Sequence, residues 1–178
     1  MLNTHFHKFE KALSKEFCEY VLASINWEEA KTAEINRGTD HLVKEETRIS
    51  RVVWQDLLTP IGCVLKNYLL QANTIWHYDL SYLEQAQVAE YGLGGHYDWH
   101  IDSKAPIDNI QRKLSISILL NDDFEGGALE FDFQRGDNVL KSQGDIVVFP
   151  SFLHHRVTPV TSGVRYSAVT WGYGPAFR

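Results

Sequence analysis

The chain lacks several features that mark common classes of protein. It has only two cysteines, Cys18 and Cys63, which are too few for the disulfide framework of a small secreted domain. No apolar run approaches the roughly 20 residues of a membrane span, and the first residues do not join a basic stretch to an apolar one as a signal peptide does. We therefore expect a soluble protein of the cytoplasm, with both thiols reduced and inert in helices.

An excess of positive charge is also missing. The 17 Lys and Arg residues are outnumbered by 23 Asp and Glu residues, which gives a net charge of -6. Proteins that bind phosphate backbones broadly need a basic surface, so we expect no nucleic-acid partner and no membrane partner. The sequence leaves the oligomeric state, the organism and the true substrate open.

Composition instead favours a single packed domain over residues 1–178. Hydrophobic residues make up 44% of the chain and aromatic residues 12%, which is typical of a folded globule. No internal repeat, linker or low-complexity stretch divides the 178 residues, and this length is sufficient to bury a core.

The first part of the chain, residues 1–73, is predicted to be helical. Ser14 can cap a helix whose apolar residues recur about every four positions, at Leu13, Phe17, Val21 and Ile25. Thr59-Pro60 is a second helix start, because a capping hydroxyl precedes a proline at the first helical position. Residues 31–50 between these helices are polar and are predicted to form a loop, a type of segment that often covers functional sites.

From about residue 74 the pattern changes to that of strands. Alternating segments bounded by turn residues lie at 113–120, 128–133, 145–149 and 164–171. Short strands at regular spacing indicate a β-sandwich or barrel, here a core over residues 74–178. The predicted fold class is therefore mainly β with flanking helices.

The segment 91–102 carries the main chemical signal. His100 and Asp102 are two residues apart, so on a strand their side chains point to the same face. His155, shortly after Pro150 at the end of another predicted strand, is a candidate third ligand. Two histidines and one carboxylate form the facial triad of non-haem Fe(II) oxygenases, which leaves coordination positions open for a bidentate co-substrate and O2.

Spacing alone does not select these three residues. His96 and Asp98 form a second His-x-Asp pair of the same parity, and His154 competes with its neighbour His155. A surface loop of unconnected polar residues is a further reading of the same pattern.

A candidate anion site lies on the last predicted strand. Arg165 and Ser167 share one face of that strand, and an arginine fork beside a hydroxyl suits a buried carboxylate. The alternative is a surface arginine on an edge strand. The remaining residues of the strand are mostly apolar or small, which favours the anion site.

Together these segments resemble the prolyl 4-hydroxylase-type 2-oxoglutarate oxygenases. The first half of the resemblance is Tyr91-x-x-Gly94-Gly95-x-Tyr97-x-x-His100-x-Asp102. The second is Phe149-Pro-Ser151, then His155-Arg-Val-Thr-Pro-Val160, then Gly163-Val-Arg165-Tyr-Ser167. The likeness covers roughly residues 75–173, and the combined pattern is far more specific than any one segment.

The resemblance implies a double-stranded β-helix, the jelly-roll or cupin-like barrel. It implies that iron is bound by His100, Asp102 and His155 rather than by the competing histidines and aspartate. Arg165, with Ser167 beside it, would bind the distal carboxylate of 2-oxoglutarate. The remaining cofactors implied are Fe(II) and O2, with ascorbate as a reductant.

Two aromatic residues also receive roles from the resemblance. Tyr91 would donate its hydroxyl to 2-oxoglutarate, and Trp171 would line the substrate side of the site. Packing in the core is the alternative for both side chains.

The activity implied is hydroxylation of a C–H bond, with release of succinate and CO2. The family default is a prolyl residue in a peptide or protein, for which Arg48 and Arg51 are candidate contacts to a peptide carbonyl. A carboxylate at Asp102 favours hydroxylation over halogenation, and nucleic-acid repair relatives usually carry an arginine where this chain has Trp171.

Other functions stay open at this point. The substrate can instead be a free amino acid or a small metabolite. A binding module that kept the fold without activity and a cupin-like metal protein without 2-oxoglutarate turnover are rivals from other classes. Arg165 with Ser167 is the feature that separates an oxygenase from the cupin-like alternative.

Overall fold

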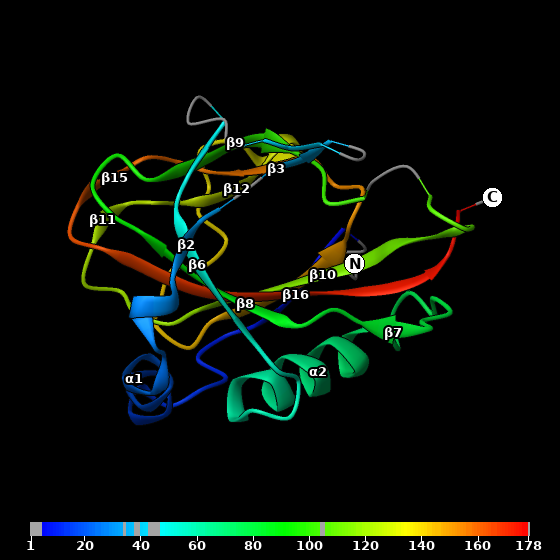
Figure 1. Cartoon of the computed structure of the whole chain (residues 1–178), viewed down its shortest axis with the longest axis horizontal. Helices are drawn as coiled ribbons and strands as arrows, with labels where there is room; N and C mark the ends of the chain where they lie inside the picture. Colours follow the sequence, from blue (N-terminus) through cyan, green and yellow to red (C-terminus); the bar gives the residue numbers. More distant parts are fainter. Residues whose placement is uncertain (1–4, 34, 38–39, 43–46, 104–105, 178) are drawn as a thin grey trace.

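The computed structural model describes residues 5–33, 35–37, 40–42, 47–103 and 106–177 (Figure 1). Two antiparallel sheets lie face to face, and helices α1 (Lys15–Ser24) and α2 (Pro60–Ala72) cover the outer side of the larger sheet. This is a jelly-roll arrangement, which confirms the predicted fold class of a mainly β protein with flanking helices.

Among the described residues, the larger sheet has eight strands and the smaller one facing it has four. In spatial order the larger sheet contains β1 (His7–Phe9), β13 (Ile146–Pro150), β10 (Ile110–Leu119), β16 (Arg165–Pro175), β8 (Ala86–Tyr91), β6 (Arg51–Gln55) and β2 (Lys31–Thr32), with β7 (Tyr82–Leu83) beside β16. The smaller sheet contains β12 (Leu129–Phe131), β14 (His155–Val157), β9 (His96–His100) and β5 (Arg48–Ile49).

Short elements complete the described chain. Two-stranded ladders join β11 (Glu125–Gly126) to β15 (Val160–Ser162) and β3 (Ile35–Arg37) to β4 (Asp40–Leu42), and single turns of 3-10 helix span Trp27–Glu29 and Asp132–Gln134. Within the described residues, no helix combines the length and apolar character needed to cross a membrane.

Both predicted helix starts are confirmed. The hydroxyl of Ser14 accepts a hydrogen bond from the backbone N–H of Phe17, and the hydroxyl of Thr59 accepts one from Gly62. Each bond satisfies one backbone donor that the first helical turn leaves without a partner.

The larger sheet separates two hydrophobic clusters. One lies between this sheet and the helices and includes Leu65 and Leu69 of α2, while the other lies between the two sheets and includes Phe131 and Phe149. Side chains of strand β10 alternate between these two regions. Ile116 and Ile118 pack in the cluster beside the helices, and Ser115 and Ser117 point into the space between the sheets. The polar face of this strand is therefore inside the molecule.

The first third of the chain contains more strand than predicted. Besides the helices it supplies β1 and β6 to the larger sheet, and the segment 31–50, predicted as a loop, contains β2, β3, β4 and β5. The alternation rule failed at β6 because Val52 and Val53 are both buried, one on each face of the sheet. Residues 34, 38–39 and 43–46 of that loop lie outside the described part, and a single domain over 1–178 stays a prediction.

A pair of neighbouring leucines in α2 tests the packing of this helix. Leu69 is fully buried and Leu70 is 42% exposed. We expect Leu69→Ala to lower the free energy of unfolding by about 2–5 kcal/mol, because it removes buried contacts and leaves a cavity. Leu70→Ala is the matched control, since it makes the same change in helix propensity, and should cost under about 1 kcal/mol in urea denaturation. Equal losses would contradict the burial of this face.

Candidate functional site

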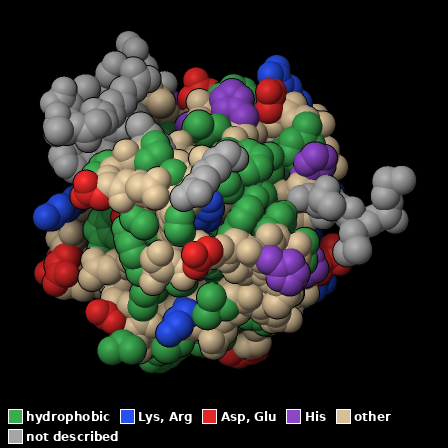
Figure 2. Space-filling model, turned by 90° about the vertical axis from the view of Figure 1, so that its right-hand side faces the viewer, with side chains coloured by type: hydrophobic (Ala, Val, Ile, Leu, Met, Phe, Trp, Pro, Cys, Tyr) green, Lys and Arg blue, Asp and Glu red, His purple; other side chains and the backbone are tan. Residues whose placement is uncertain are grey.

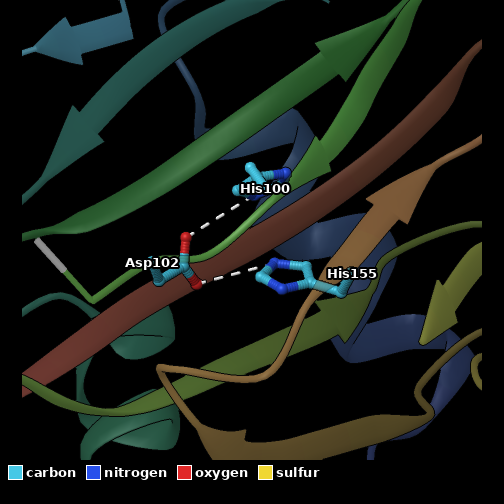
Figure 3. Close-up of side chains that lie close together, drawn as sticks. All are labelled: His100, Asp102 and His155. Atoms are coloured by element: carbon cyan, nitrogen blue, oxygen red, sulfur yellow. Dashed lines mark ion pairs between the residues drawn. The ribbon is translucent and has the colours of Figure 1, made fainter. Parts of the chain in front are cut away.

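Two histidines from strands of the smaller sheet and an aspartate that follows one of these strands converge between the sheets (Figure 3). His100 is the last residue of β9, Asp102 follows two residues later, and His155 begins β14 directly opposite His100 in the antiparallel ladder. The Asp102 carboxylate lies between the imidazoles, with 3.6 Å from Oδ1 to His100 Nε2 and 3.6 Å from Oδ2 to His155 Nε2. The ligand atoms of all three residues lie within 4.8 Å of one another.

Backbone carbonyls fix which nitrogen each histidine presents. His100 Nδ1 lies 2.7 Å from the carbonyl oxygen of Asp98, and His155 Nδ1 lies 2.8 Å from that of Leu153. A carbonyl only accepts, so each Nδ1 carries a proton and each ring turns its Nε2 toward Asp102. This second contact orients imidazoles in metal sites.

The charge states of Asp102 and His155 also suit a metal. Burial opposes ionisation of Asp102, but His155 and His100 outweigh it and hold the pKa of this carboxyl well below its usual range. Burial, with His100 acting in the same direction, lowers the pKa of His155 to about 4 although Asp102 opposes this. A carboxylate and a neutral imidazole are the forms that ligate a divalent cation.

The competing residues lie elsewhere in the structure. Asp98 is exposed and accepts a hydrogen bond from the N–H of Trp99, while His96 Nδ1 lies 2.9 Å from the carbonyl oxygen of Gly94. His154 points toward Asp132, at 3.6 Å. Within the described residues, the only group of three or more His, Cys, Asp or Glu that brings ligand atoms together is His100, Asp102 and His155.

A cavity between the sheets continues from these residues to Arg165. The Arg165 side chain is 2% exposed, its Nη1 donates to Ser167 Oγ at 3.0 Å, and its Cζ lies 5.3 Å from the ring centre of Tyr91. Its Nε has no hydrogen-bond partner, and no carboxylate pairs with it within the described residues. Burial lowers the pKa of Arg165, with Tyr91 opposing the change.

An unpaired buried guanidinium is costly, so a site of this kind calls for an anion. Gly127 makes room for the arginine stem, because a Cβ at this position would lie 2.8 Å from Arg165 Cδ. The cavity therefore offers a charged fork, a hydroxyl and an aromatic ring at one end, and the cluster of ligand atoms further along its wall.

The two arginines predicted to contact substrate lie in different places, one in the cavity and one outside it. Arg48 is buried and lines the cavity, where it donates from Nε to Ser50 Oγ at 2.9 Å and from Nη2 to Gln87 Oε1 at 2.8 Å. Arg51 does not line the cavity; its half-exposed side chain pairs with Glu90 at 2.9 Å.

Trp171 lines the cavity and is held there by a residue that sequence reasoning missed. The Arg112 guanidinium lies 3.8 Å from the Trp171 ring centre, pairs with Glu84 at 2.6 Å and donates from Nε to Tyr173 Oη at 2.9 Å. Arg112 stands just before the alternating run of β10, and no local pattern distinguishes it from a surface arginine.

Tyr97 and Ser115 were also missed as parts of the site. The Tyr97 ring stacks on His100 with 3.5 Å between ring centres, and burial raises the pKa of Tyr97 to about 12. Ser115 donates to Asp102 Oδ2 at 2.7 Å. Tyr97 was part of the quoted motif without a role, and the even spacing of Ser115 and Ser117 was a signal that β10 turns hydroxyls to one face.

Comparisons with known proteins agree with this geometry. The model of the 2OG-Fe(II) oxygenase superfamily matches residues 86–173. A PKHD-type hydroxylase of Pseudomonas fluorescens is 36% identical over 89 residues, which are 46% of this chain and 39% of that protein. The chain thus spans about two fifths of the length of this curated relative.

Two solved structures share the fold. A Pseudomonas putida prolyl-4-hydroxylase superposes with a TM-score of 0.75 at 23% identity, covering 96% of this chain and 94% of that one. A Trichoplax adhaerens prolyl hydroxylase in complex with a hypoxia inducible factor peptide fragment superposes with a TM-score of 0.71 at 18% identity, covering 96% and 84%. At these identities the likeness establishes the jelly roll alone.

The convergence of three ligand atoms predicts how the protein binds metal. We expect His100→Ala, Asp102→Ala and His155→Ala each to weaken binding of Mn(II) by more than about 100-fold, because loss of a ligand should exceed the 10–100-fold cost of losing an outer contact. Isothermal titration measures the affinity, and circular dichroism checks that each variant is folded.

Neighbouring residues supply the controls for this experiment. His96→Ala, Asp98→Ala and His154→Ala change the same residue types within a few positions of the site and should bind Mn(II) as the wild type does. Wild-type affinity in His100→Ala would overturn the assignment.

Proposed function

The chain belongs to the 2OG-Fe(II) oxygenase superfamily, and on this premise we propose that it is a dioxygenase that hydroxylates a prolyl residue in a peptide or protein. His100, Asp102 and His155 would hold Fe(II), and Arg165 would bind 2-oxoglutarate with Ser167 and Tyr91. Because the chain spans only part of its curated relative, the activity is proposed from its own site.

One observation carries the proposal: the Arg165 guanidinium is buried in the same cavity as the candidate metal ligands, and no carboxylate of the described residues pairs with it. The distal carboxylate of 2-oxoglutarate supplies the missing charge, and its other end is a bidentate ligand for a metal with open positions. A cupin-like metal protein without 2-oxoglutarate would have no use for this arginine, so Arg165 favours the oxygenase.

The chain's own residues bind, orient and shield the reactants. Bound Fe(II), with 2-oxoglutarate and O2, supplies the oxidising power for hydroxylation, and 2-oxoglutarate leaves as succinate and CO2. Arg165 and Ser167 fix the position of the co-substrate, while buried apolar residues of the cavity wall, Leu129, Phe149 and Val157, exclude water around the metal ligands. Stacking of Tyr97 on His100 limits rotation of that imidazole.

Aromatic residues beside the cavity support a peptide substrate. Trp54 lies 6.4 Å from Trp171 by ring centres, and Tyr82, 51% exposed, stacks on Tyr173 at 4.8 Å. Figure 2 views the side of the molecule where β7 and the end of β16 lie and shows hydrophobic side chains gathered on it. Exposed aromatic rings suit an extended proline-rich segment, whose polyproline II form is already ordered before binding. One solved relative is a prolyl hydroxylase with a bound peptide, in keeping with this choice.

A second candidate function is hydroxylation of a free amino acid, and Arg48 is the observation that favours it. Its hydrogen-bond partners, Ser50 and Gln87, are neutral, and no described carboxylate forms an ion pair with it. A guanidinium without an ion-pair partner bonds more strongly to the carboxylate of a free amino acid than to the neutral carbonyl of a peptide. A cytoplasmic location and the use of ascorbate as a reductant stay predictions.

Arg165→Ala tests the co-substrate site. We expect the variant to need far more 2-oxoglutarate, because losing a buried charge-assisted pair costs about 2–5 kcal/mol. Calorimetry of the Mn(II)-loaded protein measures 2-oxoglutarate affinity, and Mn(II) affinity itself should stay near the wild-type value. Arg51→Ala, which removes an arginine outside the cavity, is the matched control. Unchanged 2-oxoglutarate binding in Arg165→Ala would favour the cupin-like alternative.

Mass spectrometry tests the substrate class. Wild-type protein is incubated with Fe(II), 2-oxoglutarate and ascorbate, together with proline-rich peptides or with free amino acids. We expect a gain of one oxygen on proline in a peptide, with succinate formed in step. If only a free amino acid gains oxygen, the second candidate replaces the peptidyl one, and if succinate never forms, the oxygenase proposal itself fails.

A further inference from the structure

A chain of buried hydroxyl groups ends on the Asp102 carboxylate. Ser115 Oγ lies 2.7 Å from Asp102 Oδ2, and Ser151 Oγ lies 2.9 Å from Ser115 Oγ. Ser115 is 1% exposed and Ser151 is fully buried. These serines come from the larger sheet and from the turn after β13, whereas Asp102 follows a strand of the smaller sheet.

The direction of both hydrogen bonds follows from the acceptor at the end. An ionised carboxylate can only accept, so Ser115 donates its single proton to Asp102. Ser115 can then only accept from Ser151, which makes Ser151 the donor of the second bond. Consecutive bonds that point the same way polarise one another and strengthen the last one.

The backbone around Asp102 is held by the same turn. The N–H groups of Asp102 and Ser103 both donate to the carbonyl oxygen of Ser151, at 2.9 Å and 2.8 Å. The N–H of Ser151 donates in turn to the carbonyl oxygen of Lys113 on β10, at 3.0 Å. Hydrogen bonds therefore tie both the main chain and the side chain of Asp102 to the larger sheet and the turn after β13.

We infer that Ser115, supported by Ser151, is a positioning residue that fixes the Asp102 carboxylate so that it offers one oxygen, Oδ1, to the metal. This inference rests on the proposed metal site and adds to it which oxygen binds and what holds the other. Ser115 donates to Oδ2, whereas Oδ1 has His100 Nε2 at 3.6 Å and accepts no hydrogen bond from a described residue.

The consequence concerns the coordination positions left open. A carboxylate that is free to turn can bind a cation through both oxygens, and this would use a position that a bidentate co-substrate and O2 require. Holding Oδ2 on Ser115 keeps Asp102 a single ligand. Outer contacts of this kind typically change metal affinity 10–100-fold.

The experiment compares Ser115→Ala with one variant that keeps the hydroxyl at this position and one that removes a hydroxyl elsewhere in the cavity. Ser115→Ala should raise the Kd for Co(II) about tenfold to 100-fold and alter the visible absorption of the Co(II) protein, which reports coordination number and geometry. Ser115→Thr keeps the hydroxyl, with its extra methyl in the cavity, and should restore both. Ser117→Ala is the matched control for metal affinity, since Ser117 lines the same cavity two residues along β10 without a bond to Asp102.

A double-mutant cycle tests the order of the two serines. Ser151→Ala should weaken Co(II) binding less than Ser115→Ala, and the double variant should bind Co(II) no more weakly than Ser115→Ala alone, because Ser151 acts through Ser115. Fully additive losses would overturn this order. Thermal unfolding of the metal-free proteins separates a loss of folding from a loss of positioning.

The outcomes distinguish this inference from the proposed function. If wild-type protein binds Co(II) but Ser115→Ala has the same Kd and spectrum, the positioning role is wrong and the metal site stands. If Ser115→Ala weakens binding but Ser115→Thr does not restore it, the hydroxyl is not the cause and the inference fails. If wild-type protein binds no Co(II), the proposed function fails with it.

Discussion

The antiparallel pairing of β14 with β9 is the constraint on which the site depends. It sets His155 opposite His100, so two histidines that are far apart in sequence present Nε2 to the same point. Asp102 lies just beyond the end of β9, where its backbone is no longer held by that ladder and bonds to the Ser151 carbonyl instead. The three ligand atoms are thus held in place by both sheets together.

The space between the sheets contains several polar side chains. Arg48, Ser115, Ser117, Arg165 and Ser167 all point into it and are all buried. Buried polar groups are costly unless they are hydrogen-bonded, and most of these side chains are. The Nε of Arg165 is the exception, since no described residue bonds to it. The cavity has an unpaired guanidinium at one end and the cluster of metal-ligand atoms along its wall. Such a site suits a molecule that carries a carboxylate and a metal-binding group.

Prediction from sequence succeeded where the signal was local and failed where it was not. Ser14 and Thr59 identified both helices because capping depends on residues within one turn. Strands β1 and β6 were missed because each is short and gains its stability from partners far along the chain. Arg51 and Arg48 looked equivalent, yet one pairs with Glu90 outside the cavity and the other is buried within it. Their difference depends on strand pairing, which spacing does not reveal.

The sequence by itself determined the chemical types: a His-x-Asp pair, a later histidine, and an arginine followed by a serine on one face of a strand. It left His96 with Asp98 open because their strand parity is the same as that of His100 with Asp102, and it left His154 open beside His155. Only resemblance to a family chose among them. Tertiary structure decided the rest. It turned His100 and His155 inward and brought Ser115 to Asp102, and it buried Arg165 away from any described carboxylate. These are contacts between distant segments, and they exist only once the two sheets have packed.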